Sequence, residues 1–174
     1  MENTSKLFSD SETFQKERPL RITAQQYAEV IDEIAKRIIC FGNSDSDKSD
    51  IISDLTGVCF QDSGYEIAKY LECYGAAEYE IDADFIELLE WIEISFSKKQ
   101  DDNVRCWVIA NEIKPKLNKG AKVILTKSTI YDFSIGTTVF VNSIDLERAR
   151  YSIALEKDSN TNRVVKFETL EAII

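Results

Sequence analysis

The chain contains no histidine among its 174 residues. Histidine is the commonest general base near neutral pH and the commonest metal ligand in proteins. Its absence excludes Ser-His-Asp and Cys-His catalytic arrangements. The glycine-rich and nucleophile motifs G-x-S-x-G, G-x-x-x-x-G-K-[ST] and G-x-G-x-x-G are absent as well. The sequence therefore favours binding over catalysis, and we expect no cofactor.

Cysteine residues are few, and their spacing forms no C-x-x-C pair: they are Cys40, Cys59, Cys73 and Cys106. Without histidine, a structural zinc site would need all four of them. We therefore predict four reduced, metal-free thiols at buried or semi-buried positions.

Long apolar runs are also missing. No run reaches the roughly 18 residues of a membrane helix, and the first fifteen residues lack the apolar core of a secretory signal. We therefore expect a cytoplasmic protein with no membrane partner. The chain has only two prolines and is 44% hydrophobic, a composition typical of a folded protein rather than a disordered acidic tail.

Acidic residues are plentiful and unevenly distributed. The chain holds 31 Asp and Glu against 21 Lys and Arg, a net charge of -10. Residues 1–100 carry 21 acids and 10 bases, whereas 101–174 carry 10 acids and 11 bases. The segment 62–93 has ten acids and one base, Lys69. Clustered carboxylates attract cationic surfaces and repel phosphate.

Apolar residues recur at helical spacing through the first two thirds of the chain. Thr23 with Gln26, and Ser63 with Glu66, have the spacing of capping boxes. We predict one helix from Thr23 to about Gly42, a short helix from about Asp50 to Gly57, a third from Ser63 to Gly75, and a longer one capped by Asp82. The segment 104–114 is ambiguous between helix and strand; we favour a separate helix capped by Asp102 or Asn103 and ended by Pro115.

After Gly120 the period changes to the alternation of strands, over residues 121–126, 137–142, 149–156 and 162–167. This order of a strand, a long loop ending in Gly, two strands and a hairpin is similar to that of SH3-like barrels, as a likeness of fold. We therefore predict an α+β protein. It should have a loosely held arm (1–20), an acidic helical domain (21–115) and a small SH3-like β-barrel (120–174).

The acidic stretch supplies the leading candidate site. Carboxylates three and four apart on a helix lie about 5–6 Å apart, comparable to the spacing of phosphates along a nucleic-acid strand. We therefore predict a surface that imitates nucleic acid and binds a basic-surfaced protein, such as a nucleic-acid-handling enzyme. The predicted partner-binding residues are Glu80, Asp84, Glu87, Glu90, Glu93 and Trp91.

Two other charged segments are weaker candidates. The loop from Asn43 to Asp54 is rich in aspartate but lacks the Gly and Glu positions of an EF-hand, so we interpret it as a solvated loop. Segment 114–127 holds five lysines and no acid, but it lacks interleaved aromatics for base stacking. Direct nucleic-acid binding is therefore disfavoured.

Two alternative functions stay open. The protein could be an adaptor whose barrel binds a partner through Tyr131 and Phe133 of the 128–136 loop. It could also be a carboxylate-based hydrolase, although nothing in the sequence distinguishes a catalytic pair among the 31 carboxylates.

Overall fold

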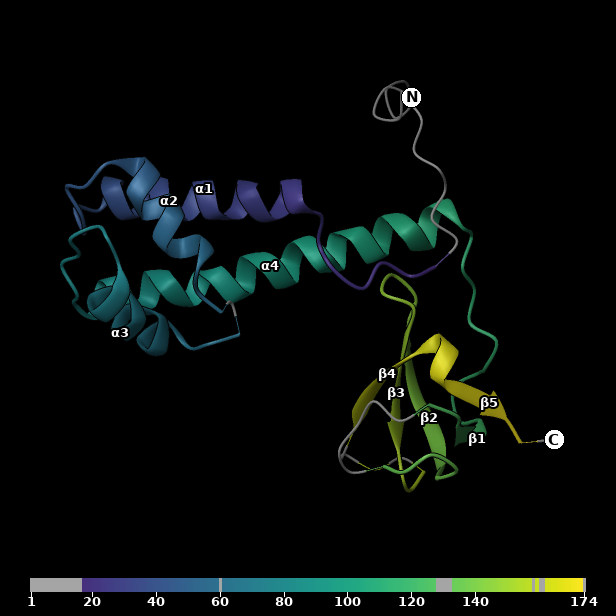
Figure 1. Cartoon of the computed structure of the whole chain (residues 1–174). Coiled ribbons are helices and arrows are strands. Elements are labelled where there is room, and N and C mark those ends of the chain that lie inside the picture. The colour runs from purple at the N-terminus through teal and green to yellow at the C-terminus, as the bar shows by residue number, and fades with distance from the viewer. Residues whose placement is uncertain (1–16, 60, 128–132, 158, 160–161, 174) are drawn as a thin grey trace. The chain divides into compact units, whose positions relative to one another are not determined.

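The computed structural model describes residues 17–59, 61–127, 133–157, 159 and 162–173. Within them the protein has four α-helices followed by a five-stranded antiparallel sheet (Figure 1). The predicted α+β class, with helices N-terminal and strands C-terminal, is confirmed. Among the described helices, none combines the length and the apolar character required to traverse a bilayer.

The chain divides into two compact units. Leu20–Asn103 forms the helical unit, and the sheet unit comprises Glu17–Pro19 with the described residues from Val104 onward. This division falls inside the last helix, whereas the predicted domains 21–115 and 120–174 place it after that helix. Those domain boundaries stay a prediction.

The helices begin and end largely at the signals present in the sequence. They are α1 (Ala24–Cys40), α2 (Lys48–Thr56), α3 (Gly64–Tyr74) and α4 (Ala83–Ala110). Both predicted capping boxes are confirmed: the Gln26 N–H donates to Thr23 Oγ1 and the Glu66 N–H donates to Ser63 Oγ. Gly42 follows α1 with a φ of 77°, in the left-handed region that glycine adopts most readily.

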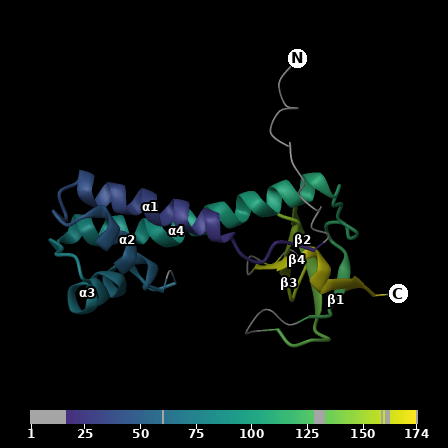
Figure 2. The same cartoon turned by 45° about the horizontal axis from the view of Figure 1, so that its top comes forward.

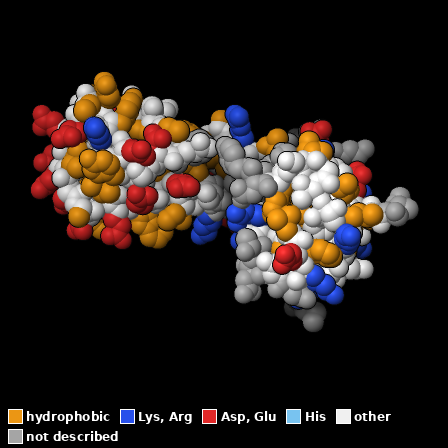
Figure 3. Space-filling view, turned by 90° about the horizontal axis from the view of Figure 1, so that it is seen from below, with side chains coloured by type: hydrophobic (Ala, Val, Ile, Leu, Met, Phe, Trp, Pro, Cys, Tyr) orange, Lys and Arg blue, Asp and Glu red, His pale blue; other side chains and the backbone are white. Residues whose placement is uncertain are grey.

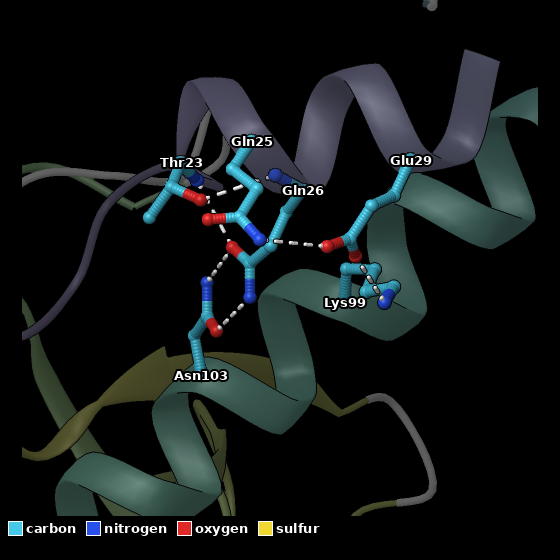
Figure 4. Close-up of polar contacts among 6 residues, drawn as sticks. All are labelled: Thr23, Gln25, Gln26, Glu29, Lys99 and Asn103. Carbon is cyan, nitrogen blue, oxygen red and sulfur yellow. Dashed lines mark hydrogen bonds and ion pairs between the residues drawn. The ribbon is translucent and has the colours of Figure 1, made fainter. Parts of the chain in front are cut away.

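Helix α4 is longer than predicted. It runs without a break through Asp102 and Asn103, so the prediction of a separate helix capped there is wrong. Asn103 contacts α1 instead: the side-chain amides of Asn103 and Gln26 pair reciprocally, at 2.7 and 2.9 Å (Figure 4). Lys99 lies one turn earlier and forms an ion pair with Glu29 of α1. Asn103 is thus used in a tertiary contact rather than as a helix cap.

The helical unit is built around one apolar core. Helix α1 lies along α4 in both ribbon views (Figures 1 and 2), and Tyr27 stacks on Phe96 with ring centroids 5.0 Å apart. Helix α3 approaches α4 at Gly64, where an added Cβ would lie 2.4 Å from the Ile86 carbonyl oxygen. Only glycine fits at that position without displacing backbone.

The sheet comprises β1 (Lys122–Leu125), β2 (Thr138–Asp145), β3 (Arg150–Ala154), β4 (Arg163–Lys166) and β5 (Leu170–Ala172). Its strand order is β4-β3-β2-β1-β5, with every pair antiparallel (Figure 1). The four predicted strands are confirmed. In the described residues β4 and β5 form opposite edges, so the sheet is not closed into the predicted barrel.

Arg18 belongs to the segment predicted to be a loosely held arm, yet it is only 8% exposed. Its guanidinium donates to both Glu168 carboxylate oxygens and to the carbonyls of Arg148 and Ala149. It also lies over the Trp107 ring, 5.3 Å from the centroid. Four hydrogen bonds from this guanidinium thus tie Glu17–Pro19 to the sheet unit, and the loosely held arm as a whole stays a prediction. Residues 1–16 lie outside the described residues.

Candidate acidic binding surface

The negative charge of the chain is concentrated on the helical unit. Leu20–Asn103 contains 19 acidic and seven basic residues, whereas the sheet unit has a slight excess of basic residues. In Figure 3, acidic and hydrophobic side chains are interspersed over the face of the helical unit in view, with few basic ones among them. This unit therefore presents a surface suited to a cationic partner.

Four of the seven basic residues of the helical unit form ion pairs with carboxylates of α1. Lys36 and Lys48 both bind Asp32, and Lys99 binds Glu29. The hydrogen bond from Lys36, followed by that from Lys48, lowers the pKa of Asp32, and Lys99 lowers the pKa of Glu29 in the same way. The charges on this side of the unit are therefore largely balanced within the fold.

The carboxylates of 62–93 differ sharply from those of α1. Among the described residues, none of these ten side chains forms an ion pair. Three act as backbone caps, namely Glu66, Asp82 and Glu90. The other seven are exposed, and no side-chain hydrogen bond engages them in the described part of the chain: Asp62, Glu72, Glu78, Glu80, Asp84, Glu87 and Glu93. We call these seven residues the acidic surface.

The structure brings part of the predicted partner-binding set together. Asp84, Glu87 and Trp91 follow one another at spacings of three and four on α4, so they share one side of the helix. Ile94, three residues after Trp91, extends the same side. Trp91 is 46% exposed and Ile94 is 53% exposed. We call Asp84, Glu87, Trp91 and Ile94 the α4 stripe.

The remaining predicted residues are placed differently. Glu80 precedes the Asp82 cap and is therefore not on the helix. Glu90 accepts a hydrogen bond from the Gly64 N–H at 2.8 Å, so it serves the start of α3. Glu93 follows Asp84 by nine residues, or two and a half turns, and therefore lies on the opposite side of α4.

Glu78 and Glu80 are positioned by the loop that precedes α2. Ser44 Oγ donates to the Glu78 carbonyl, the Glu78 N–H donates to Ser46 Oγ, and the Glu80 N–H donates to the Asn43 carbonyl at 2.8 Å. These contacts border an open depression of about 380 Å³ lined by residues 42–46 and 78–80. The aspartate-rich loop thus serves as a scaffold for acidic side chains.

Asp54 has a structural role that the sequence alone does not reveal. Its carboxylate accepts hydrogen bonds from the Ala76 and Ala77 N–H groups and, at 2.9 Å, from the Tyr79 hydroxyl. Burial, and then the hydrogen bond to Asp54, raise the pKa of Tyr79 above its ordinary value. Asp54 therefore holds the segment that leads into α4. No sequence signal pairs it with residues more than twenty positions away.

Trp91 already contacts one cation of its own chain. The Arg37 guanidinium lies over the indole with its central carbon 5.8 Å from the ring centroid. Glu33 binds the same guanidinium at 2.7 Å, so the Arg37 charge is compensated. Trp91 nevertheless remains 46% exposed.

The structure also describes residues of the other predicted features, namely the lysine-rich segment, the 128–136 loop and the cysteines. The five lysines of 114–127 are all exposed. Of the two aromatic residues predicted for an adaptor, Phe133 is buried in the sheet core and Tyr131 lies outside the described residues.

All four cysteines are free and exposed, so the prediction of buried or semi-buried thiols is wrong. They lie on solvent faces of helices or in a loop. Within the described ranges, no three or more Cys, Asp or Glu residues are grouped to hold a metal ion.

In comparisons with known proteins, no family model, no curated protein and no solved structure matches this chain.

Proposed function

We propose that the protein is a non-enzymatic, cytoplasmic inhibitor that blocks a basic site on a larger protein. The partner would be a protein that handles nucleic acid, such as a defence nuclease or a nuclease toxin. The helical unit would occupy the groove in which that partner binds phosphates. In this role the chain acts as a nucleic-acid mimic.

The observation that carries the proposal is the set of seven exposed carboxylates that the described fold leaves without partners. Like charges three or four apart on a helix destabilise it by a few tenths of a kcal/mol per pair. Glu87 therefore adds nothing to helix stability, whereas Asp82 and Glu90 act as backbone caps and Asp84 lies in the first turn of α4, where the helix dipole favours a carboxylate. A surface that is costly to keep and unused by the fold fits a binding role.

Affinity capture tests the proposal. The full chain is used as bait in cell extract at low and high salt, beside the Asp84→Asn, Glu87→Gln double variant. A mimic should retain a nucleic-acid-binding protein at low salt, lose it steeply as ionic strength rises, and compete with nucleic acid for it. The double variant should retain less of it. Capture that is insensitive to both salt and the substitutions contradicts the proposal.

A second candidate is an adaptor whose sheet unit, SH3-like in strand order, carries the binding site. Exposed apolar side chains on this unit favour it, among them Ile135, Leu155 and Val164. Such a contact would be apolar and therefore weakly dependent on salt. Substituting Val164 by serine would reduce capture in this case and leave it unchanged if the acidic surface is the site.

A further inference from the structure

The α4 stripe combines apolar and acidic side chains on one side of a helix. Trp91 and Ile94 are large apolar residues with about half of their surface in solvent. Asp84 and Glu87 precede them on the same side of the helix and are exposed carboxylates. An apolar patch flanked by carboxylates is complementary to a side chain that is itself both apolar and cationic.

Glu87 and Trp91 are separated by four residues of one helix, so their Cβ atoms lie about 5–6 Å apart. A guanidinium is planar, stacks on aromatic rings, and binds a carboxylate through two parallel N–H groups. A single guanidinium can therefore lie on the Trp91 ring while it donates to the Glu87 carboxylate. A lysine ammonium is a compact, strongly hydrated charge that matches the carboxylate but stacks less well.

We propose that the α4 stripe is a receptor for arginine in the basic partner. Trp91 stacks on the guanidinium, Glu87 binds it, Asp84 binds a neighbouring cation, and Ile94 packs on the aliphatic stem. The occupant is an arginine-rich segment of a protein. This inference rests on the proposed function and adds to it a preference for arginine over lysine.

The chain itself contains a version of this contact. Arg37 lies over the Trp91 ring while its guanidinium binds the Glu33 carboxylate. An indole and a glutamate thus already hold one arginine in this unit. Because Glu33 pairs with Arg37, Asp84 and Glu87 keep the charge of the stripe negative.

The test compares two labelled peptides, octa-arginine and octa-lysine, by fluorescence anisotropy with the full chain at low salt. We expect the arginine peptide to bind more tightly by about 2- to 5-fold, the difference that an exposed cation–π contact supplies. The Trp91→Leu variant should lose that preference and bind the two peptides equally. The Trp91→Phe variant, which keeps an aromatic ring, should retain part of it.

Two carboxylate variants of equal charge provide the control. Glu87→Gln should weaken the arginine peptide more than Glu93→Gln does, because Glu93 lies on the opposite side of α4. Equal binding of the two peptides, or a preference that survives Trp91→Leu, overturns the arginine receptor. If both peptides bind equally and still weaken with Glu87→Gln, the electrostatic function stands without it. If neither peptide binds, both proposals fail.

Discussion

Asp54 and Tyr79 connect the end of α2 to the segment that carries Glu78 and Glu80. Replacing Tyr79 by Phe removes one hydrogen bond to Asp54 and should lower the free energy of unfolding by about 1 kcal/mol. Urea unfolding at neutral pH measures this loss. Tyr74→Phe is the control, because Tyr74 is exposed and donates no hydrogen bond in the described structure. Equal stability of the two variants would contradict the role of Tyr79.

The same pair predicts a pH dependence. Burial first, and Asp54 second, raise the pKa of Tyr79 in the folded state above its ordinary value of 10.0. Its contribution to stability is therefore fully present below about pH 10 and is lost as the pH rises through the higher folded value. We expect the unfolding midpoint in urea to fall above about pH 10, and to fall less in Tyr79→Phe. A parallel decline in both proteins would exclude Tyr79 as its source.

Arg18 makes four hydrogen-bond contacts in the sheet unit and stacks on Trp107. Lysine cannot reproduce this planar arrangement, so Arg18→Lys should destabilise the sheet unit by about 2 kcal/mol. Urea unfolding, followed by indole fluorescence, measures this loss of stability. Arg21→Lys, at an exposed position, is the control. An unchanged midpoint in Arg18→Lys would show that these contacts are dispensable.

Within α4, two acidic residues one turn apart have different tasks. Glu90 caps the start of α3 through the Gly64 N–H, whereas Glu87 has no such partner in the described structure. Glu90→Ala should therefore lower stability by about 1 kcal/mol, a typical loss for a helix cap. Glu87→Ala removes the same charge and should leave the thermal midpoint nearly unchanged. Equal effects would mean that the cap contributes nothing.

Elements defined by local signals were predictable from the sequence. Thr23 and Ser63 cap α1 and α3 through residues three positions away, so the pattern suffices. In α4, by contrast, Asn103 lies within the helix and pairs with Gln26, 77 residues away, a contact that local sequence does not predict. Alternating periodicity predicts the strands but not whether the two edge strands pair with each other. The sequence therefore did not show that the described sheet is open rather than closed into a barrel.

At the scale of the whole molecule, the sequence located the acidic surface but not its geometry. Charge counting identified 62–93, and a spacing of three residues on a helix grouped Asp84 with Glu87. The sequence pattern could not reveal that Glu90 caps α3, because this cap requires the close approach of Gly64 to Ile86. Nor did it find Asp54, which acts through backbone groups of a distant loop.

The charge imbalance of the helical unit predicts how salt affects the full chain. With 19 acids against seven bases, repulsion among carboxylates should outweigh the exposed ion pairs of α1. Raising NaCl from about 0.01 M to about 1 M shortens the Debye length from about 30 Å to about 3 Å, which screens this repulsion. The thermal midpoint, followed by helical circular dichroism, should therefore rise with salt.

The Glu87→Gln, Glu93→Gln double variant sharpens this expectation. It removes two charges from α4 without touching the Glu90 cap, and glutamine has nearly the helix propensity of glutamate. At low salt the variant should melt slightly above the wild type, by the few tenths of a kcal/mol that each like-charge pair costs. At high salt the two proteins should converge, because screening has already removed the repulsion. A variant that melts lower at low salt would mean that these carboxylates stabilise the fold, and would remove the main support for a binding role.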